Sequence, residues 1–85
     1  MTNTIYAVVI ARLAHLLIEN GIAFDYGRLY DGYQIKGDGW DAVIHSGSYG
    51  HADGLLEIMG NIVRDTEDDV EGWLTPLEVL ERVKG

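Results

Sequence analysis

Two closely spaced tight-turn signals constrain the fold more than any other feature of the sequence. The dipeptide Asp-Gly at 31–32 is typical of a two-residue β-hairpin, and Gly-Asp-Gly at 37–39 is a second glycine-rich turn. Short runs that suit strands flank both turns, at 29–30, 33–36 and 40–45. The pattern therefore predicts a meander of three antiparallel strands, with Tyr33 and Ile35 on one face of the second strand.

A long apolar run, from Ile5 to Ile18, precedes the turns. The run contains the polar residues Arg12 and His15, and Glu19 follows it directly. At helical spacing these three residues fall on a single narrow stripe. Asn-Gly at 20–21 is a suitable end for a helix because both residues tolerate positive φ. A helix that is apolar over most of its circumference needs burial on two sides, so we expect either a central element or a helix shared across a homodimer.

The second half of the chain contains one ambiguous segment and one clear one. Residues 46–54 have the composition of a loop, and residues 55–65 suit either a helix or a second hairpin turning at Gly-Asn 60–61. We favour the hairpin because a mid-helix glycine costs about 1 kcal/mol relative to alanine. Thr-Pro-Leu-Glu at 75–78 is a capping box that predicts a C-terminal helix, with Leu77, Leu80 and Val83 on its inner face.

Length and composition limit the class of protein. The 85 residues suit one domain, 1–85, and the hydrophobic fraction of 47% is typical of a folded globule. The chain has no cysteine, which excludes disulfides and zinc–thiolate sites. The N-terminal run lacks a basic leader and is shorter than the roughly 18–20 apolar residues of a membrane span, so we expect a cytoplasmic protein without membrane contact. The predicted fold class is α+β, with an N-terminal helix packed on an antiparallel sheet of three to five strands and a C-terminal helix.

The net charge of −8, from fourteen acidic and six basic side chains, bears on the choice of partner. Proteins that bind nucleic acid directly bring clustered Lys and Arg side chains to the phosphates, and this chain has few of them. We therefore expect no direct nucleic-acid binding. A basic surface on another protein is the partner that this charge favours.

An acidic run, DTEDDVE at 65–71, contains most of the clustered negative charge. An EF-hand loop would need glycine at its sixth position and an acid at its twelfth, where this chain has Val70 and Pro76. Two interpretations stay open. The carboxylates could mark the start of a short helical turn through Val70 and Trp73, where the helix dipole favours them, and they could also form a recognition surface for a basic partner.

Other candidate chemistry is weaker. His45, His51 and Asp53 could supply two imidazoles and a carboxylate to a metal, which makes a metal-binding protein or enzyme one alternative prediction. A self-associating structural protein, driven by the apolar first helix, is the other. The G-x-G-x-x-A match at 37–42 lacks a following helix, so we interpret it as a turn. The run GSYG at 47–50 is not the G-x-S-x-G elbow of hydrolases. We expect no cofactor and no enzymatic activity.

Tyrosine and tryptophan are dense around the predicted sheet, and aromatic side chains beside carboxylates are typical of protein interfaces. We expect the chain to be a non-catalytic protein-binding module. The predicted partner contacts combine the acidic run, the glycine-rich loop and one tryptophan: Asp65, Glu67, Asp68, Asp69, Glu71, Trp40, Ser48, Tyr49, His51 and Asp53.

Two segments carry a resemblance: YDGYQIKGDGWDAVIHSGSYGHADGLLEI and DTEDDVEGWLTPLEVLERV. They resemble small acidic proteins of phages and other mobile elements, in which a W/Y-G-S-Y-G-type loop leads into a G-L-x-E-I strand and D-D-V-x-G-[WY]-L-T leads into a terminal helix. In size, charge and element order the chain is also similar to anti-CRISPR inhibitors that mimic DNA. The motif resemblance implies a phage or mobile-element protein, and the similarity in size, charge and element order implies a protein that engages a basic host protein and inhibits a defence nuclease.

Overall fold

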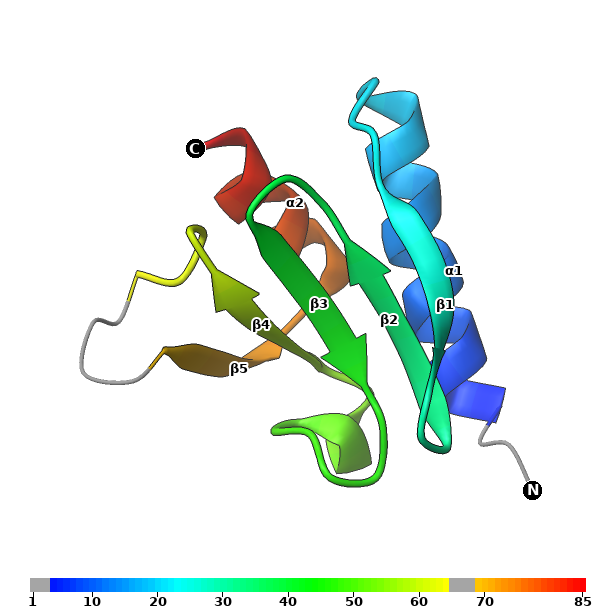
Figure 1. The fold of residues 1–85 in the computed structure, drawn as a ribbon. Coiled ribbons are helices and arrows are strands. Elements are labelled where there is room, and N and C mark those ends of the chain that lie inside the picture. Colours follow the sequence, from blue (N-terminus) through cyan, green and yellow to red (C-terminus); the bar gives the residue numbers. More distant parts are fainter. Residues whose placement is uncertain (1–3, 65–68) are drawn as a thin grey trace.

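The computed structural model describes residues 4–64 and 69–85. Its strands form one antiparallel sheet in the order β1-β2-β3-β4-β5, preceded and followed by a helix (Figure 1). This arrangement confirms the predicted α+β class. The elements are α1 (Thr4–Glu19), β1 (Asp25–Leu29), β2 (Gly32–Lys36), β3 (Trp40–Ile44), a single 3₁₀ turn η1 (His51–Asp53), β4 (Leu56–Gly60), β5 (Val70–Leu74) and α2 (Pro76–Lys84).

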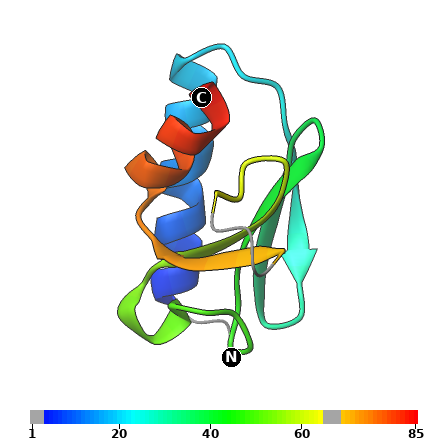
Figure 2. The same ribbon diagram turned by 90° about the vertical axis from the view of Figure 1, so that its left-hand side faces the viewer.

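The fold has two layers, with both helices against the same face of the sheet (Figure 2). α1 packs on β2 and β3, and α2 packs on β4, β5 and α1. The opposite face of the sheet carries polar pairs such as Gln34 and Asp41, in which Gln34 Nε2 donates to Asp41 Oδ2 at 2.9 Å. An antiparallel sheet tolerates this arrangement because it can pack one face on the core and leave the other in water.

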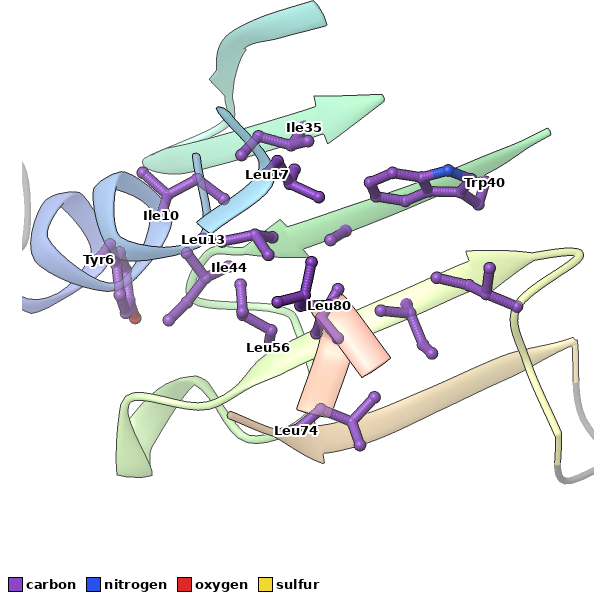
Figure 3. Packing of buried hydrophobic residues seen from close by; sticks show 14 residues of the cluster. Tyr6, Ile10, Leu13, Leu17, Ile35, Trp40, Ile44, Leu56, Leu74 and Leu80 are labelled. Carbon is purple, nitrogen blue, oxygen red and sulfur yellow. The ribbon is translucent and has the colours of Figure 1, made fainter. Parts of the chain in front are cut away.

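The core lies between the two layers (Figure 3). Ile10, Leu13 and Leu17 of α1 are fully buried against the sheet. Ile35, Ala42 and Ile58 lie opposite one another on adjacent strands and form a buried row under the helices. Each large aliphatic side chain removed from water in this way contributes about 1.5–3 kcal/mol to folding.

The N-terminal helix is confirmed, but one chain buries only one of its sides. Tyr6, Ile10, Leu13 and Leu17 recur at helical spacing and are buried. The outer side keeps exposed apolar residues: Ile5 is 55%, Val8 52% and Ile18 66% exposed. Within the described residues, the second covering layer that the sequence predicts is therefore missing. No helix of this part of the chain is long and apolar enough to cross a membrane.

The first hairpin and the 37–39 turn are confirmed, with a shift of one residue in the hairpin loop. β1 pairs with β2 through Leu29 and Gly32, so the two-residue loop is Tyr30-Asp31 and not Asp31-Gly32. Tyr30 has φ of +52°. Gly32 is instead required by close packing, because a Cβ there would lie 1.8 Å from the carbonyl oxygen of Ile44.

Residues 55–65 contain a strand, as the favoured interpretation predicted, and the helical alternative is wrong. However, β4 pairs with β5 and not with the residues that directly follow Gly60. The backbone N–H of Asn61 donates to Gly39 O at 2.9 Å, and its side-chain Nδ2 donates to Asp38 O at 3.2 Å. Asn61 thus joins the end of β4 to the β2–β3 turn. The strand that pairs with β4 begins only later in the chain, at Val70.

The predicted helical turn through Val70 and Trp73 is wrong, since these residues belong to β5. Asp65, Glu67 and Asp68 lie outside the described residues. The described part of the acidic segment therefore leads into a strand, and the helix dipole does not explain Asp69 or Glu71.

The C-terminal helix begins as predicted. Glu78 N donates to Thr75 Oγ1 at 3.1 Å, and Thr75 N donates to Glu78 Oε1 at 2.9 Å, which completes the capping box. The predicted inner face is shifted, however. Val79 and Leu80 are buried and Val83 is partly buried, whereas Leu77 is 54% exposed because the second helical position points away from the sheet.

Candidate functional site

The loop 45–50, after β3, is closed by hydrogen bonds of its own. Ser48 N and Ser48 Oγ donate to His45 O at 3.0 and 2.9 Å, and His45 N donates back to Ser48 Oγ at 3.0 Å. Asp31 of the first hairpin accepts a further bond from Ser46 N at 2.9 Å. Because these groups satisfy one another, the loop reaches Tyr49 in a defined conformation.

The η1 turn fixes the other end of the loop. Gly50 O accepts bonds from Asp53 N at 3.0 Å and from Leu55 N at 2.9 Å. The His51 ring lies edge-on to Tyr6, and a hydrogen bond of 2.8 Å joins its Nδ1 to the Tyr6 hydroxyl. The loop is therefore attached to α1 as well as to the sheet.

Tyr49 lies where this loop meets β5. Its backbone N–H donates to Glu57 Oε1 at 3.0 Å, and its carbonyl accepts a bond from Trp73 N at 3.4 Å. Two glycines permit the approach. A Cβ on Gly72 would lie 2.4 Å from Tyr49 Cβ, and one on Gly50 would lie 3.0 Å from the Trp73 backbone.

Trp73 takes a backbone conformation that is rare for large residues. Its φ is +59°, in the left-handed region. The pairing of β4 with β5 shifts here, because Leu56 opposes Leu74 while Ile58 opposes Glu71, so β5 carries one extra residue at Gly72–Trp73. This is a β-bulge, a device that changes the direction of a side chain at a sheet edge.

The result is an exposed aromatic pair, Tyr49 and Trp73. The two rings are stacked, with centroids 5.4 Å apart and planes 15° from parallel. Each side chain is nevertheless 56% exposed, so the stack does not belong to the core. Strained backbone that displays large aromatic side chains is typical of binding sites, because the strain costs about 1–3 kcal/mol without a return in burial.

The other predicted partner contacts divide into accessible and inaccessible residues. Asp53 and Asp69 are exposed, and His51 is partly buried beside Tyr6. Trp40 is only 8% exposed and belongs to the core, and Ser48 is 3% exposed. These two are a correction to the predicted set, since Trp40 belongs to the core cluster and Ser48 closes the loop.

Glu71 is engaged within the chain. Its carboxylate accepts a bidentate pair from Arg82 of α2, at 2.6 Å for Arg82 Nη1, and a bond from Arg64 N at 3.2 Å. Both side chains of the ion pair are partly buried, and the bond raises the pKa of Arg82. Glu71 therefore attaches α2 to β5, a structural role that the sequence analysis did not assign to it.

The alternative metal set is not assembled. His45 Nδ1 accepts a bond from Gly47 N at 3.0 Å, while His51 Nδ1 is engaged with Tyr6. Across residues 4–64 and 69–85, no three His, Asp or Glu side chains are placed to hold a metal ion. The Ser48 hydroxyl bonds to the backbone of His45 and not to its ring, so the two do not form a nucleophile–base pair.

Two residues of the site were missed by the sequence analysis, Trp73 and Glu57. Trp73 was assigned to a helical turn, and Glu57 was not singled out within the segment 55–65. The sequence does contain one relevant signal, a glycine directly before Trp73 in a strand-like run, because such a glycine often marks a bulge. The contact with Tyr49 depends on a bond between residues far apart in sequence.

Comparison with protein-family models, with curated proteins and with solved structures found no match to this chain. The resemblance to phage proteins thus stays a prediction.

Proposed function

We propose that this protein is a non-catalytic binding module that engages a basic surface of another protein through the aromatic pair. The observation that carries the proposal is the stack of Tyr49 on Trp73, more than half exposed and held by a left-handed backbone at Trp73. Tyr and Trp side chains contribute most to interfaces when they are rigid before binding, because little entropy is then lost.

Charge supports a basic partner. Glu57 lies beside the pair through its bond to Tyr49 N, and Asp53 and Asp69 are exposed on the segments that lead to the two rings. The chain as a whole carries −8. Such a field accelerates encounter with a positively charged surface, and salt weakens the effect.

Affinity capture from a bacterial lysate tests the proposal. The immobilised wild-type chain is compared with Trp73→Ala and with Tyr30→Ala, which removes a tyrosine that is 81% exposed at the first hairpin and whose ring packs on His45. We expect at least one basic protein to be retained by the wild type and by Tyr30→Ala but lost with Trp73→Ala. If both variants lose the same proteins, or neither loses any, the aromatic pair is not the binding site.

The acidic run is tested separately. Asp65, Glu67, Asp68 and Asp69 are changed to Asn together, while Glu71 is kept because it holds Arg82. We expect the four substitutions to weaken capture of the partner at low salt and to weaken it less at high salt, because salt screens long-range attraction between charges. Equal capture at low salt would show that the run has no part in recognition.

A nucleic-acid-binding nuclease of a host defence system is one class of basic partner that fits the proposal. Its basic groove would accept an acidic protein in place of DNA. Competition decides this point: added duplex DNA should displace the captured nuclease from the chain. A nuclease that binds the chain and DNA at the same time would contradict mimicry of DNA.

Self-association through α1 is a second candidate, favoured by the exposed Ile5, Val8 and Ile18. Ile5 and Ile18 lie at equal distances from the middle of the helix, so an antiparallel pair of copies would place one against the other. Arg12 lies near that centre and would face its own copy, so salt should strengthen the dimer. This salt dependence is opposite to that of a basic partner.

Analytical ultracentrifugation of Val8→Glu tests the dimer. Leu77→Glu is the matched control, since Leu77 is equally exposed on the other helix. We expect Val8→Glu to reduce the sedimentation coefficient to that of a monomer and Leu77→Glu to leave it unchanged. A wild-type chain that is monomeric at high salt would exclude this candidate.

A further inference from the structure

We infer that the aromatic pair binds the guanidinium group of an arginine side chain, stacked on the indole of Trp73. The inference rests on the proposed function and names the chemical group that the site recognises. It depends on the ring geometry, on the nearby carboxylate and on the fixed loop, as follows.

The rings provide a flat π surface. The Tyr49 and Trp73 rings are 15° from parallel, and each residue is 56% exposed although the two rings are stacked. An aromatic face carries negative electrostatic potential, and indole attracts cations more strongly than phenol or benzene does. A planar guanidinium matches such a surface better than a compact ammonium, because it stacks and is more weakly hydrated.

A carboxylate is fixed next to this surface. Glu57 Oε1 accepts the Tyr49 N–H at 3.0 Å, which holds the carboxylate beside the stack and leaves Oε2 for a second donor. Guanidinium N–H groups are suited to such an acceptor while the plane of the group rests on a ring. The site therefore combines an aromatic face with a carboxylate, and these two features distinguish a site for a cation from one that is only apolar.

The chain already contains a contact of this kind at the opposite edge of the sheet. The guanidinium carbon of Arg28 lies 5.0 Å from the centroid of the Tyr33 ring, and Tyr33 in turn stacks on Tyr26. At that edge a stacked aromatic pair carries an arginine of the same chain. At the Tyr49–Trp73 pair, the arginine would come from the partner.

The geometry does not suit a proline-rich ligand. Such segments insert proline rings into grooves between aromatic side chains. Here the two rings are in contact with each other, so no groove separates them. An arginine side chain needs only the outer face, and the loop that presents Tyr49 is already ordered by its own hydrogen bonds, so binding incurs little loss of loop entropy.

Two-dimensional ¹H–¹⁵N NMR of the wild-type chain tests the inference. The sequence has two tryptophans, so the buried Trp40 indole is an internal control for Trp73, and Trp73→Phe assigns the signals. The probes are a tri-arginine peptide, its tri-citrulline counterpart, which is neutral and similar in shape, and a tri-lysine peptide.

We expect the Trp73 indole signal to shift saturably with tri-arginine while the Trp40 signal stays in place. Tri-lysine should bind about fivefold more weakly, and tri-citrulline should bind more weakly still. Glu57→Gln keeps an acceptor for Tyr49 N but removes the charge, and we expect about fivefold weaker binding of tri-arginine.

The inference is overturned if citrulline binds as well as arginine, if tri-lysine equals tri-arginine, or if tri-arginine moves neither indole signal or both equally. These results leave the proposed function in place, provided that Trp73→Ala still loses a protein that Tyr30→Ala captures from the lysate. Conversely, a lysate in which Trp73→Ala loses nothing contradicts the proposed function even where the isolated peptide binds.

Discussion

The first hairpin and the β5 edge contain the same pair of unusual features. At the hairpin, Tyr30 has φ of +52°, and nearby Gly32 packs against the backbone of Ile44. At the edge, Trp73 has φ of +59°, and the adjacent Gly72 packs against Tyr49. In both places a large aromatic residue takes a left-handed conformation next to a glycine that cannot be replaced without a steric clash.

The cause of the left-handed residue differs between the two regions. Tyr30 occupies a two-residue hairpin loop, where positive φ matches the twist of the strands, so the local turn accounts for it. Trp73 lies inside a strand, where no turn requires positive φ. The bulge in the β4–β5 pairing places Trp73 against the loop carrying Tyr49, which is distant in sequence. Bulges occur often next to functional sites, where they change the direction of a side chain, and this is why we place the binding site at β5 and not at the hairpin.

The largest effect should come from Gly32→Ala at the hairpin. The added Cβ would lie 1.8 Å from Ile44 O and 2.9 Å from His45 Cα, and backbone atoms in a paired strand cannot move away cheaply. We expect a loss of about 3 kcal/mol in the free energy of unfolding, measured by chemical denaturation. Gly27→Ala in β1 is the control, because nothing lies within 4 Å of its Cβ position, and a similar loss there would contradict the steric explanation.

Gly72→Ala should have an intermediate effect of about 2 kcal/mol. Its Cβ would lie 2.4 Å from Tyr49 Cβ and 3.0 Å from Tyr49 O, but a loop can withdraw where a strand cannot. We therefore expect withdrawal of the loop to separate the rings, visible as a change in near-ultraviolet circular dichroism, and loss of the captured partner. Retention of both the stack and the partner would show that the contact between the Tyr49 loop and β5 does not depend on Gly72.

The extent to which the sequence predicted the fold follows from the range of the interactions. The capping box at 75–78, the apolar helix at 5–18 and the turn at 37–39 depend on neighbouring residues, and all three are confirmed. Residues 70–73 were assigned to a helical turn because carboxylates precede them. Pairing with β4 overrides that local preference, and strand pairing between distant segments is not visible in a local pattern.

The candidate site follows the same rule. Tyr49 was predicted as a contact because it lies in a glycine-rich loop, and loops of this kind are exposed. Trp40 was predicted on its residue type alone, and it is buried in the core cluster. Trp73 and Glu57 were missed because their roles depend on Tyr49, which contacts them only in the folded chain.

A smaller effect should distinguish the two left-handed residues from ordinary strand positions. Replacing Ala by Gly in a strand normally costs about 0.5–1 kcal/mol. At Trp73 and Tyr30 the order should reverse, with the Gly variant about 1 kcal/mol more stable than the Ala variant, because glycine takes positive φ without strain. Denaturation of the four variants measures this. If Gly is less stable than Ala at Trp73 but not at Tyr30, only the hairpin is strained.

The smallest effect concerns the carboxylate that joins the hairpin to the loop. Asp31 accepts a hydrogen bond from Ser46 N at 2.9 Å, as Glu57 accepts one from Tyr49 N, so carboxylates hold the loop near both of its ends. The bond from the Ser46 backbone lowers the pKa of Asp31 below its ordinary value of 3.8. A lowered pKa means that Asp31 stabilises the fold above its unfolded-state pKa and that this contribution is lost as the pH falls through the folded-state pKa.

Asp31→Asn keeps an acceptor for Ser46 N and removes only the charge. We expect the wild type to be slightly more stable than this variant near neutral pH, and the difference to shrink as the pH falls below 3.8 and to be lost through the lower folded-state pKa of Asp31. Denaturation curves of both proteins across this range measure it. A difference that is the same at all pH values would mean that the charge of Asp31 does not contribute. The hydrogen bond from Ser46 N, and not the charge of its acceptor, would then join the hairpin to the binding loop. The negative charge of Asp31 would serve only to attract the basic partner.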